Sequence, residues 1–396
     1  MSAVIETDEA FIDLCDHIRA QGLVGFDTEF VSDSGYRPAL GLLQFATRER
    51  AAAVDPLAIS SLDRWWELMA DDITTVVVHG GQAEIRFCQQ YLGKPPTKLF
   101  DVQVAEGFRG RSYPLSYSAL VRRVLNLGVD GSQTRTDWTR RPLSDDQLRY
   151  ALEDVQHLLE IYDQQSAWLQ QQHRLDWVWN EVERLIGDIC SDARIEPWQR
   201  LPGLHKLSRR ELAVIQRLAD WREEEARSQN RPVRRILRDD LLVDLARRRP
   251  ETAKQALATR DLNRREYRRH IDRIVAVVRE AVEISESDLP RRPRSRRDDA
   301  SSDEQIVAKL LALSLSNRCA ELDVAYTLVT NNRELQELVR FHRHGDRDGQ
   351  VPRILEGWRG ELFGDLARNV MDGKVAFRVS PPGSPTPLLF ESSESN

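Results

Sequence analysis

Hydrophobic residues in the first third of the chain fall into short runs that alternate with helical patterns. Short apolar, β-branched runs bounded by Gly, Pro or Asp are typical of strands, whereas apolar residues three or four apart predict helices. Helical patterns occur near 62–69 and from Gln82 onward. The strand-like runs are LVGFDTEF at 23–30, LGLLQFA at 40–46, AAAVDP at 51–56 and TTVVVHG at 74–80. This order predicts an α/β domain in which helices flank a sheet.

Helical periodicity dominates the rest of the chain. Two predicted helices close the first domain, at 115–125 and at 144–162, and the second opens with Ser144 and Gln147 at capping-box spacing. Strand patterns nearly vanish beyond about residue 170, and the segment 208–227 starts with another capping box. The pattern therefore predicts all-helical units after the α/β domain.

Changes in composition divide the helical part of the chain. The stretch SESDLPRRPRSRRDDASSDE, which starts at Ser285, is charged, contains proline and has few apolar residues, as is typical of a linker. Further helical patterns follow, then a strand-like VAFRV, and the Pro- and Ser-rich end predicts a frayed tail. The predicted division is an α/β domain at 1–170, a helical domain at 200–284, a linker at 285–303, a second helical domain at 304–381 and a flexible tail at 382–396.

Composition favours a folded, soluble protein. Hydrophobic residues make up 41% of the chain and charged residues 30%, and nine Trp are available to anchor cores. No apolar run approaches the roughly twenty residues of a membrane helix, and the acidic N-terminus lacks a signal-peptide layout. We therefore expect a cytoplasmic protein that binds no membrane, and we favour a monomer. The four isolated cysteines are expected to be reduced packing residues.

Charge is distributed unevenly along the chain. The formal net charge of -6 argues against a nucleic-acid partner, because phosphate groups are bound by Lys and Arg. Arginines nevertheless cluster in the middle third, at 234–238, 247–249 and 264–269. A solvated face explains these clusters as well as a nucleic-acid-binding patch does, and the composition leaves both interpretations open.

The first candidate for chemistry is the pair Asp27 and Glu29. These acids lie two residues apart in a strand-like run, so the period of a strand places both on one face of the sheet. Two acids there are costly to bury unless a cation neutralises them, and carboxylate oxygens suit Mg²⁺ or Mn²⁺. The alternative is an exposed strand end with solvated acids.

Two further segments carry acids. Tyr150 and Asp154 stand four apart in a predicted helix and share one of its faces. Glu84 lies in the first turn of the helix that follows the apolar run ending at Val78 and a glycine-bearing turn. Taken alone, the segment at 150–154 is explained by a packed Tyr150 and a solvated Asp154. Its combination with the strand pair Asp27 and Glu29 is what favours a shared site.

In this order and spacing, the three segments resemble the exonuclease motifs of the DEDD superfamily, and within it the ribonuclease D-like group with a tyrosine in the third motif. The resemblance continues through LFDVQ at 99–103 and TDWTRRPL at 136–143 and covers about residues 20–162. WREEEAR at 221–227 resembles the helicase-and-ribonuclease-D C-terminal (HRDC) domain. GWRGELFG at 357–364 is similar to the end of the second, more divergent helical domain of ribonuclease D.

The resemblance implies a metal-dependent 3′-5′ exoribonuclease on a ribonuclease H-like mixed sheet flanked by helices, followed by HRDC-like helical domains. It implies a site for two Mg²⁺ or Mn²⁺ ions, nucleoside 5′-monophosphate products, and RNA substrates with structured 3′ ends such as tRNA precursors. Tyr150 would orient the attacking water or help to deprotonate it. The implied catalytic residues are Tyr150 and the four acids that would bind metal, Asp27, Glu29, Glu84 and Asp154.

The helical domains offer candidate contacts to RNA. Trp221 and Trp358 are expected to anchor cores rather than to stack on bases. Phosphate contacts are expected from four arginines of the first helical domain, Arg222, Arg234, Arg235 and Arg238.

The chain departs from the family at one motif position. Family members usually have Asp where this chain has Glu84, which is longer by one methylene. If that acid acts largely through water, we expect reduced or retuned activity. Two alternatives remain: a catalytically weakened RNA-binding protein on an exonuclease fold, and a DNA 3′-5′ exonuclease, which the acids alone do not distinguish from one that acts on RNA.

Overall fold

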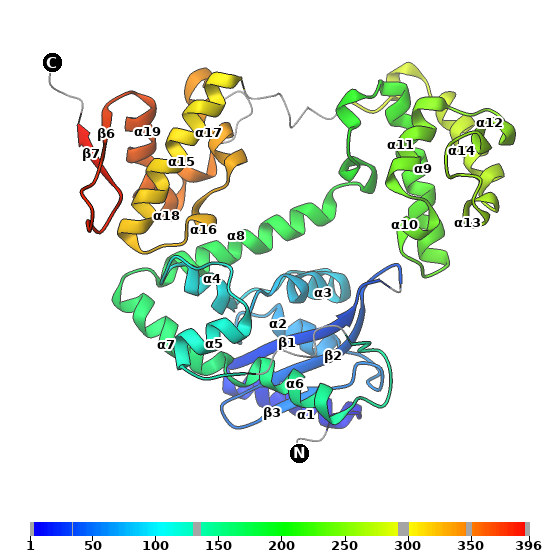
Figure 1. Cartoon of the computed structure of the whole chain (residues 1–396). Coiled ribbons are helices and arrows are strands. Elements are labelled where there is room, and N and C mark those ends of the chain that lie inside the picture. The colour runs from blue at the N-terminus through cyan, green and yellow to red at the C-terminus, as the bar shows by residue number, and fades with distance from the viewer. Residues whose placement is uncertain (1–3, 34, 130–135, 292–300, 346–350, 393–396) are drawn as a thin grey trace.

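The computed structural model describes residues 4–33, 35–129, 136–291, 301–345 and 351–392. It consists of an N-terminal sheet domain, a middle helical domain and a C-terminal helical unit (Figure 1). The long helix α8 (Leu175–Arg194) leads from the sheet domain toward the middle domain. No helix within these ranges combines the length and the apolar character needed to cross a membrane.

The sheet domain is built on a mixed five-stranded sheet with the strand order β3-β2-β1-β4-β5. Strand β2 runs antiparallel to both of its neighbours, β1 and β3, whereas β4 runs parallel to β1 and β5 runs parallel to β4. This confirms the predicted fold class. The strands are β1 (Leu23–Val31), β2 (Ala39–Ala46), β3 (Ala51–Val54), β4 (Thr75–Val78) and β5 (Leu99–Asp101).

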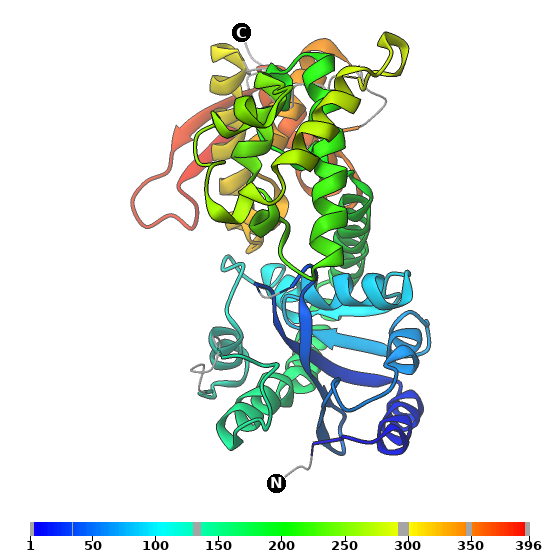
Figure 2. The ribbon, with the colours of Figure 1, turned by 90° about the vertical axis from the view of Figure 1, so that its right-hand side faces the viewer.

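Helices cover both faces of this sheet (Figure 2). Phe26 of β1 contacts Trp65 and Trp66 of α2, with ring centroids 4.6 and 6.2 Å apart. Gly25 faces the other way, where a Cβ atom would lie 3.1 Å from Leu158 of α7. The helices of the domain are α1 (Asp8–Gln21), α2 (Asp63–Met69), α3 (Gln82–Leu92), α4 (Val102–Gly107), α5 (Tyr117–Leu125), α6 (Asp145–Gln156) and α7 (Leu158–Gln171).

The middle domain has a hydrophobic core of its own. Trp221 is buried in it, as expected, and the long helix α9 packs against α14 and α11. The α-helices of the domain are α9 (Arg209–Ser228), α10 (Val233–Ile236), α11 (Asp239–Arg248), α12 (Ala253–Leu257), α13 (Arg265–Arg268) and α14 (Ile271–Val282).

The C-terminal unit shares its core with the sheet domain. The ring of Trp358 lies 4.8 Å from Phe108 and 5.8 Å from Trp177, and the amide of Ala325 donates to the carbonyl of Gly107 at 2.8 Å. Trp358 is therefore a core anchor, as predicted. The unit comprises α15 (Ser302–Leu322), α16 (Tyr326–Val329), α17 (Asn332–His344), α18 (Gly357–Arg359), a π-helical turn (Gly360–Gly364), α19 (Asp365–Met371), β6 (Val375–Val379) and β7 (Leu388–Ser392).

The predicted helix at 144–162 is in fact two helices, α6 and α7, that meet at His157. A continuous helix would pair the amide of His157 with the carbonyl of Glu153. Instead, the Tyr117 hydroxyl accepts from the His157 amide at 3.2 Å and donates to the Glu153 carbonyl at 3.0 Å. A side chain inserted between these two groups breaks the helix.

The predicted linker and tail also need correction. Residues 285–291 pack on the middle domain, where Leu289 is buried and Arg209 donates to its carbonyl at 2.8 Å. Within the predicted tail, β7 pairs with β6, because the apolar run at 388–390 places Phe390 against Phe377 at 5.6 Å. The rest of the linker, at 292–300, and the last residues, at 393–396, lie outside the described residues.

Candidate active site

Asp27 and Glu29 lie on β1 and project from the face of the sheet that α6 and α7 cover. Both side chains are partly exposed to solvent. The strand is interior, with β2 on one side and β4 on the other. Pairing with β2 holds the backbone at both acids, whereas pairing with β4 ends at Gly25. The register with β2 shifts just after Glu29.

Tyr150 and Asp154 reach the same face from α6. The helix begins with both halves of the predicted capping box between Ser144 and Gln147. Ala151 is fully buried over β2 and β3, which fixes the rotation of the helix on the sheet. The Tyr150 hydroxyl hydrogen-bonds to the Asp154 carboxylate one turn away. Strand β1 and helix α6 therefore bring together three of the four predicted acids and the tyrosine.

Burial, together with repulsion from neighbouring acids, raises the pKa values of Asp27, Glu29 and Asp154. Burial and repulsion from Asp154 and Glu84 raise the pKa of Glu29 to about 8. Burial raises the pKa of Asp154 to about 6, although the hydrogen bond from Tyr150 opposes this shift. The pKa of Asp27 lies well above its ordinary value because of burial and the three surrounding acids. A positive charge among the carboxylates would stabilise their ionised forms.

Glu84, the fourth predicted acid, is held differently. It lies in the first turn of α3, is 3% exposed, and accepts a hydrogen bond of 2.6 Å from the Thr28 hydroxyl. Thr28 lies between Asp27 and Glu29, so its side chain points to the opposite face of β1. Burial raises the pKa of Glu84 to about 7, and the hydrogen bond from Thr28 opposes the shift. The charge of Glu84 raises the pKa of Asp27, although the Glu84 carboxylate accepts its hydrogen bond from Thr28 on the opposite face of β1.

Asp101, to which the sequence analysis assigned no role, holds the glycine turn that precedes α3. Its carboxylate accepts from the amides of Gly80 and Gly81 at 3.0 Å each and from the amide of Gln103 at 2.9 Å. Gly80 has a φ of 67°, a conformation that favours glycine. The position of Glu84 therefore depends on Asp101, and a buried acid at the end of the LFDVQ strand is the signal that would have found it.

The segment TDWTRRPL at 136–143 packs against β2 beside Tyr150. Arg141 makes a bidentate ion pair with Asp55, with N–O distances of 2.5 and 2.6 Å, and also donates to the carbonyl of Gly41 at 2.7 Å. Trp138 is buried against Gly41, and its ring lies 6.2 Å from that of Tyr150. This segment therefore supports Tyr150 from the side of β2 and β3.

The donor chemistry of the acidic face fits a hard divalent cation. Carboxylate oxygens are the ligands that Mg²⁺ and Mn²⁺ prefer. Within the described ranges, no three acidic, histidine or cysteine side chains converge closely enough to surround one ion. The fit therefore rests on the kind of donor, the shared face and the mutual repulsion of Asp27, Glu29 and Asp154.

The arginines predicted to contact RNA differ in their surroundings. Arg222 is only 3% exposed and donates to the Leu237 carbonyl and to Asp239, so it serves the core and its predicted RNA contact is wrong. Arg235 is exposed. Arg234 pairs with Asp239 at 3.1 Å and Arg238 pairs with Asp240 at 2.6 Å, near the surface in both cases. RNA contacts by these three arginines stay predictions.

The loop after β1 contacts the middle domain. The amide of Tyr36 donates to the side-chain oxygen of Asn230 at 3.2 Å, and the Arg227 guanidinium lies 5.5 Å from the centre of the Tyr36 ring. The strand that carries Asp27 and Glu29 is thus linked through its own loop to the C-terminal end of α9.

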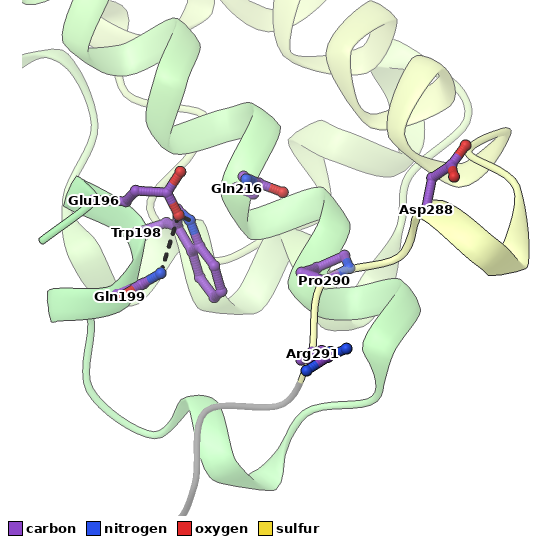
Figure 3. Close-up of a pocket in the computed structure, with 7 residues that line it drawn as sticks. All are labelled: Glu196, Trp198, Gln199, Gln216, Asp288, Pro290 and Arg291. Carbon is purple, nitrogen blue, oxygen red and sulfur yellow. Dashed lines mark hydrogen bonds between the residues drawn. The ribbon is translucent and has the colours of Figure 1, made fainter.

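The middle domain contains a pocket (Figure 3). Glu196 in this pocket accepts from the Trp198 indole at 2.7 Å and from the Gln199 amide at 3.0 Å, so neutral donors already occupy its carboxylate. The pocket holds none of the predicted catalytic residues. Its lining residues are Glu196, Trp198, Gln199, Gln216, Asp288, Pro290 and Arg291.

Comparison with known protein families identifies two domains in the chain. Residues 2–168 match a 3′-5′ exonuclease family, and residues 211–278 match the HRDC domain. The first match covers the sheet domain, and the second covers most of the middle helical domain.

Similarity to curated proteins extends over nearly the whole chain. Ribonuclease D of Pseudomonas paraeruginosa is 30% identical over 371 residues, which span 93% of this chain and 97% of that protein. Ribonuclease D of Desulfotalea psychrophila is 31% identical and spans 92% of this chain and 96% of that protein. Among solved structures, Escherichia coli RNase D, an exoribonuclease involved in structured RNA processing, matches with a TM-score of 0.82 and 27% identity over 94% of this chain and 99% of that one.

Proposed function

The chain belongs to the ribonuclease D family of 3′-5′ exoribonucleases, and we propose that its reaction centre is the acidic face formed by β1 and α6. The observation that supports this proposal most directly is the grouping of Asp27, Glu29 and Asp154 on one face of the sheet, where burial and repulsion from neighbouring acids raise the pKa values of Asp27 and Glu29. Crowded acids of this kind mark functional sites more often than structural ones.

We propose that the acids hold two Mg²⁺ or Mn²⁺ ions. Asp27, Glu29 and Asp154 would hold these ions, and Glu84 would support them through water. Its hydrogen bond to Thr28, a residue of the opposite face, is consistent with such an indirect role. When bound, a pair of these ions stabilises the attacking and the departing oxygens of a phosphodiester.

Tyr150 positions the attacking water in this proposal. A phenol has an ordinary pKa of about 10, so it stays protonated at neutral pH and is a poor base. Its hydrogen bond to Asp154 and the packing of Trp138 hold the ring in place. Hydrolysis then breaks the bond between phosphorus and the 3′ oxygen, and the product is a nucleoside 5′-monophosphate.

The proposed substrates are RNAs with a free 3′ end next to structure, such as tRNA precursors. The relative from Escherichia coli is described as acting in structured RNA processing. Arg234, Arg235 and Arg238 of the HRDC domain are proposed to contact phosphates. We also expect a monomeric enzyme that works in the cytoplasm.

The principal alternative is a protein of this family whose catalysis is weakened by Glu84. Three features favour an active enzyme. The acids Asp27, Glu29 and Asp154 are present, Tyr150 is hydrogen-bonded to Asp154, and Asp101 holds the turn before Glu84. A preference for DNA is the other alternative, because the acidic face contains nothing that distinguishes the sugar.

Digestion of matched RNA and DNA oligonucleotides tests the proposed function. Each strand carries a label at its 5′ end or its 3′ end and is incubated with Mg²⁺, Mn²⁺ or EDTA. Stepwise shortening of 5′-labelled RNA, with release of the 3′ label as a monophosphate and no reaction in EDTA, is expected. Faster digestion of DNA would support the DNA alternative, and RNA binding without cleavage under either ion would support the weakened protein.

A further inference from the structure

Gln44 lies on β2 directly opposite Asp27. Directly opposite residues of an antiparallel pair project from the same face of the sheet, with Cβ atoms about 4.5–5.5 Å apart. On its other side Gln44 pairs with Ala53 of β3. Its side chain is 0% exposed, and it lies on the face covered by Ala151 of α6. Gln44 is therefore buried beside the central acid of the proposed site.

The surroundings of Gln44 do not explain an amide at this position. Apart from Asp27, the residues around it on this face form an apolar cluster that includes Leu42 of the same strand, Ala53 of the next strand and Ala151 of α6. Neither Nε2 nor Oε1 of Gln44 has a hydrogen-bond partner in the described part of the chain. Buried amides nearly always have partners, because an unpaired one destabilises the fold. A purely structural role would be better served by an apolar side chain.

Asp27, on the neighbouring strand β1, is the acceptor to which the side-chain amide of Gln44 can donate. Its carboxylate can accept several hydrogen bonds, and the backbone amide of Thr28 supplies one. A neutral amide can orient such a carboxylate without cancelling its charge, whereas Lys or Arg would compete with a metal ion for it. Hydrogen bonds of this kind hold metal-binding carboxylates in many proteins.

We propose that Gln44 is a positioning residue of the reaction centre: its Nε2, which is unpaired among the described residues of this structure, would turn to donate to Asp27 when the divalent ions bind and would fix the orientation in which Asp27 holds them. The inference rests on the proposed function of the acidic face and deepens it. Gln44 touches neither substrate nor ion and acts through Asp27.

Replacement of Gln44 by Leu separates this role from a structural one. Leu has nearly the volume of Gln and leaves no polar atom unpaired, so the melting temperature of the ion-free protein is expected to stay the same or rise. Divalent-ion affinity and kcat are expected to fall about 10- to 100-fold. Leu43→Met, at the neighbouring position on the opposite face of β2, is the matched control and is expected to behave as the wild type.

The experiment compares full-length wild type, Gln44→Leu, Leu43→Met and Asp27→Ala. It measures Mn²⁺ binding to the RNA-free protein by electron paramagnetic resonance, the melting temperature, and kcat and KM on 5′-labelled RNA. The inference predicts that Gln44→Leu weakens Mn²⁺ binding and lowers kcat, with KM changed less than about twofold and no loss of thermal stability.

Three outcomes would overturn the inference. If Gln44→Leu keeps the ion affinity and kcat of the wild type while Asp27→Ala is inactive, Gln44 has no positioning role and the proposed function is unaffected. A fall in activity that only follows a fall in melting temperature would make Gln44 structural. Full activity in Asp27→Ala would overturn the proposed site together with the inference.

Discussion

The Tyr117 hydroxyl replaces the helical hydrogen bond between the His157 amide and the Glu153 carbonyl. It accepts from the amide at 3.2 Å and donates to the carbonyl at 3.0 Å. The break between α6 and α7 therefore falls three residues after Asp154. Because Tyr117 comes from α5, a contact between distant parts of the chain decides where the helix that carries Tyr150 and Asp154 ends.

Replacement of Tyr117 by Phe should reduce turnover. Without the hydroxyl, the amide of His157 and the carbonyl of Glu153 can pair directly, which extends α6 and shifts Asp154. We expect kcat to fall about tenfold and stability to fall by about 1 kcal/mol, the usual value of one such hydrogen bond. Single-turnover digestion of RNA measures the first effect and chemical denaturation the second. Tyr162→Phe on α7 is the control, and equal rates in both variants would refute this role.

Tyr150→Phe should lower kcat by about 10²-fold or more while divalent-ion binding is preserved. The change removes the hydroxyl that is proposed to position the water, and it leaves the ring that packs near Trp138. Calorimetric titration with Mn²⁺ and steady-state kinetics on the same RNA give the two quantities. Turnover near that of the wild type would exclude Tyr150 from the mechanism.

Glu84→Gln should lower kcat by about 10- to 100-fold, because the charge is lost while the side-chain oxygen can still accept from Thr28. The melting temperature should therefore change little. Glu84→Asp restores the residue usual in the family and is expected to stay within about tenfold of the wild type. A rise in turnover of several orders of magnitude in Glu84→Asp would show instead that Glu84 impairs the native site.

Glu181 should make the docking of the C-terminal unit sensitive to acid. It lies on α8 and pairs with Arg359 and Arg353 of that unit at 2.7 Å each. Burial alone would raise its pKa, but the hydrogen bond from Arg184 and the charges of these arginines outweigh burial and lower the pKa. Because the pKa of Glu181 is lower in the folded protein than its ordinary value of 4.5, the ionised side chain stabilises the fold at pH values above 4.5. This stabilisation is lost as the pH falls through the pKa of Glu181 in the folded protein.

Thermal melting between pH 7 and pH 3 checks this expectation with Glu181→Gln. At pH 7 the variant should be less stable by about 3 kcal/mol, because it leaves buried arginine charge uncompensated. The difference should shrink in the acidic range below 4.5, where the wild type also loses its ion pairs. A difference that stays constant with pH would show that the charge of Glu181 is not the cause.

The sequence predicted the elements that depend on local pattern. The β1 pair of acids and the capping box of α6 follow from strand period and local hydrogen bonding, and both are present. Contacts between distant segments were not predictable in the same way. The break at His157 depends on Tyr117, and the burial of Arg222 depends on Asp239 and the Leu237 carbonyl.

Family motifs supplied the candidate residues but not their surroundings. The spacing around Glu84 indicated a fourth acid, yet only the fold shows that Thr28 binds its carboxyl group. Gln44 is one polar residue in an apolar strand pattern, and strand register is what places it opposite Asp27. Register depends on pairing between strands, so the sequence of β2 alone could not predict this neighbour.

The proposed reaction centre is tested most directly by the rates at which wild type and Asp27→Ala shorten a 5′-labelled RNA in Mg²⁺, measured side by side. We expect a ladder of products that shorten from the 3′ end in the wild type, and a rate at least about 10³-fold lower in a folded Asp27→Ala variant. Equal rates in the two proteins would contradict the claim that the acids of β1 and α6 form the reaction centre.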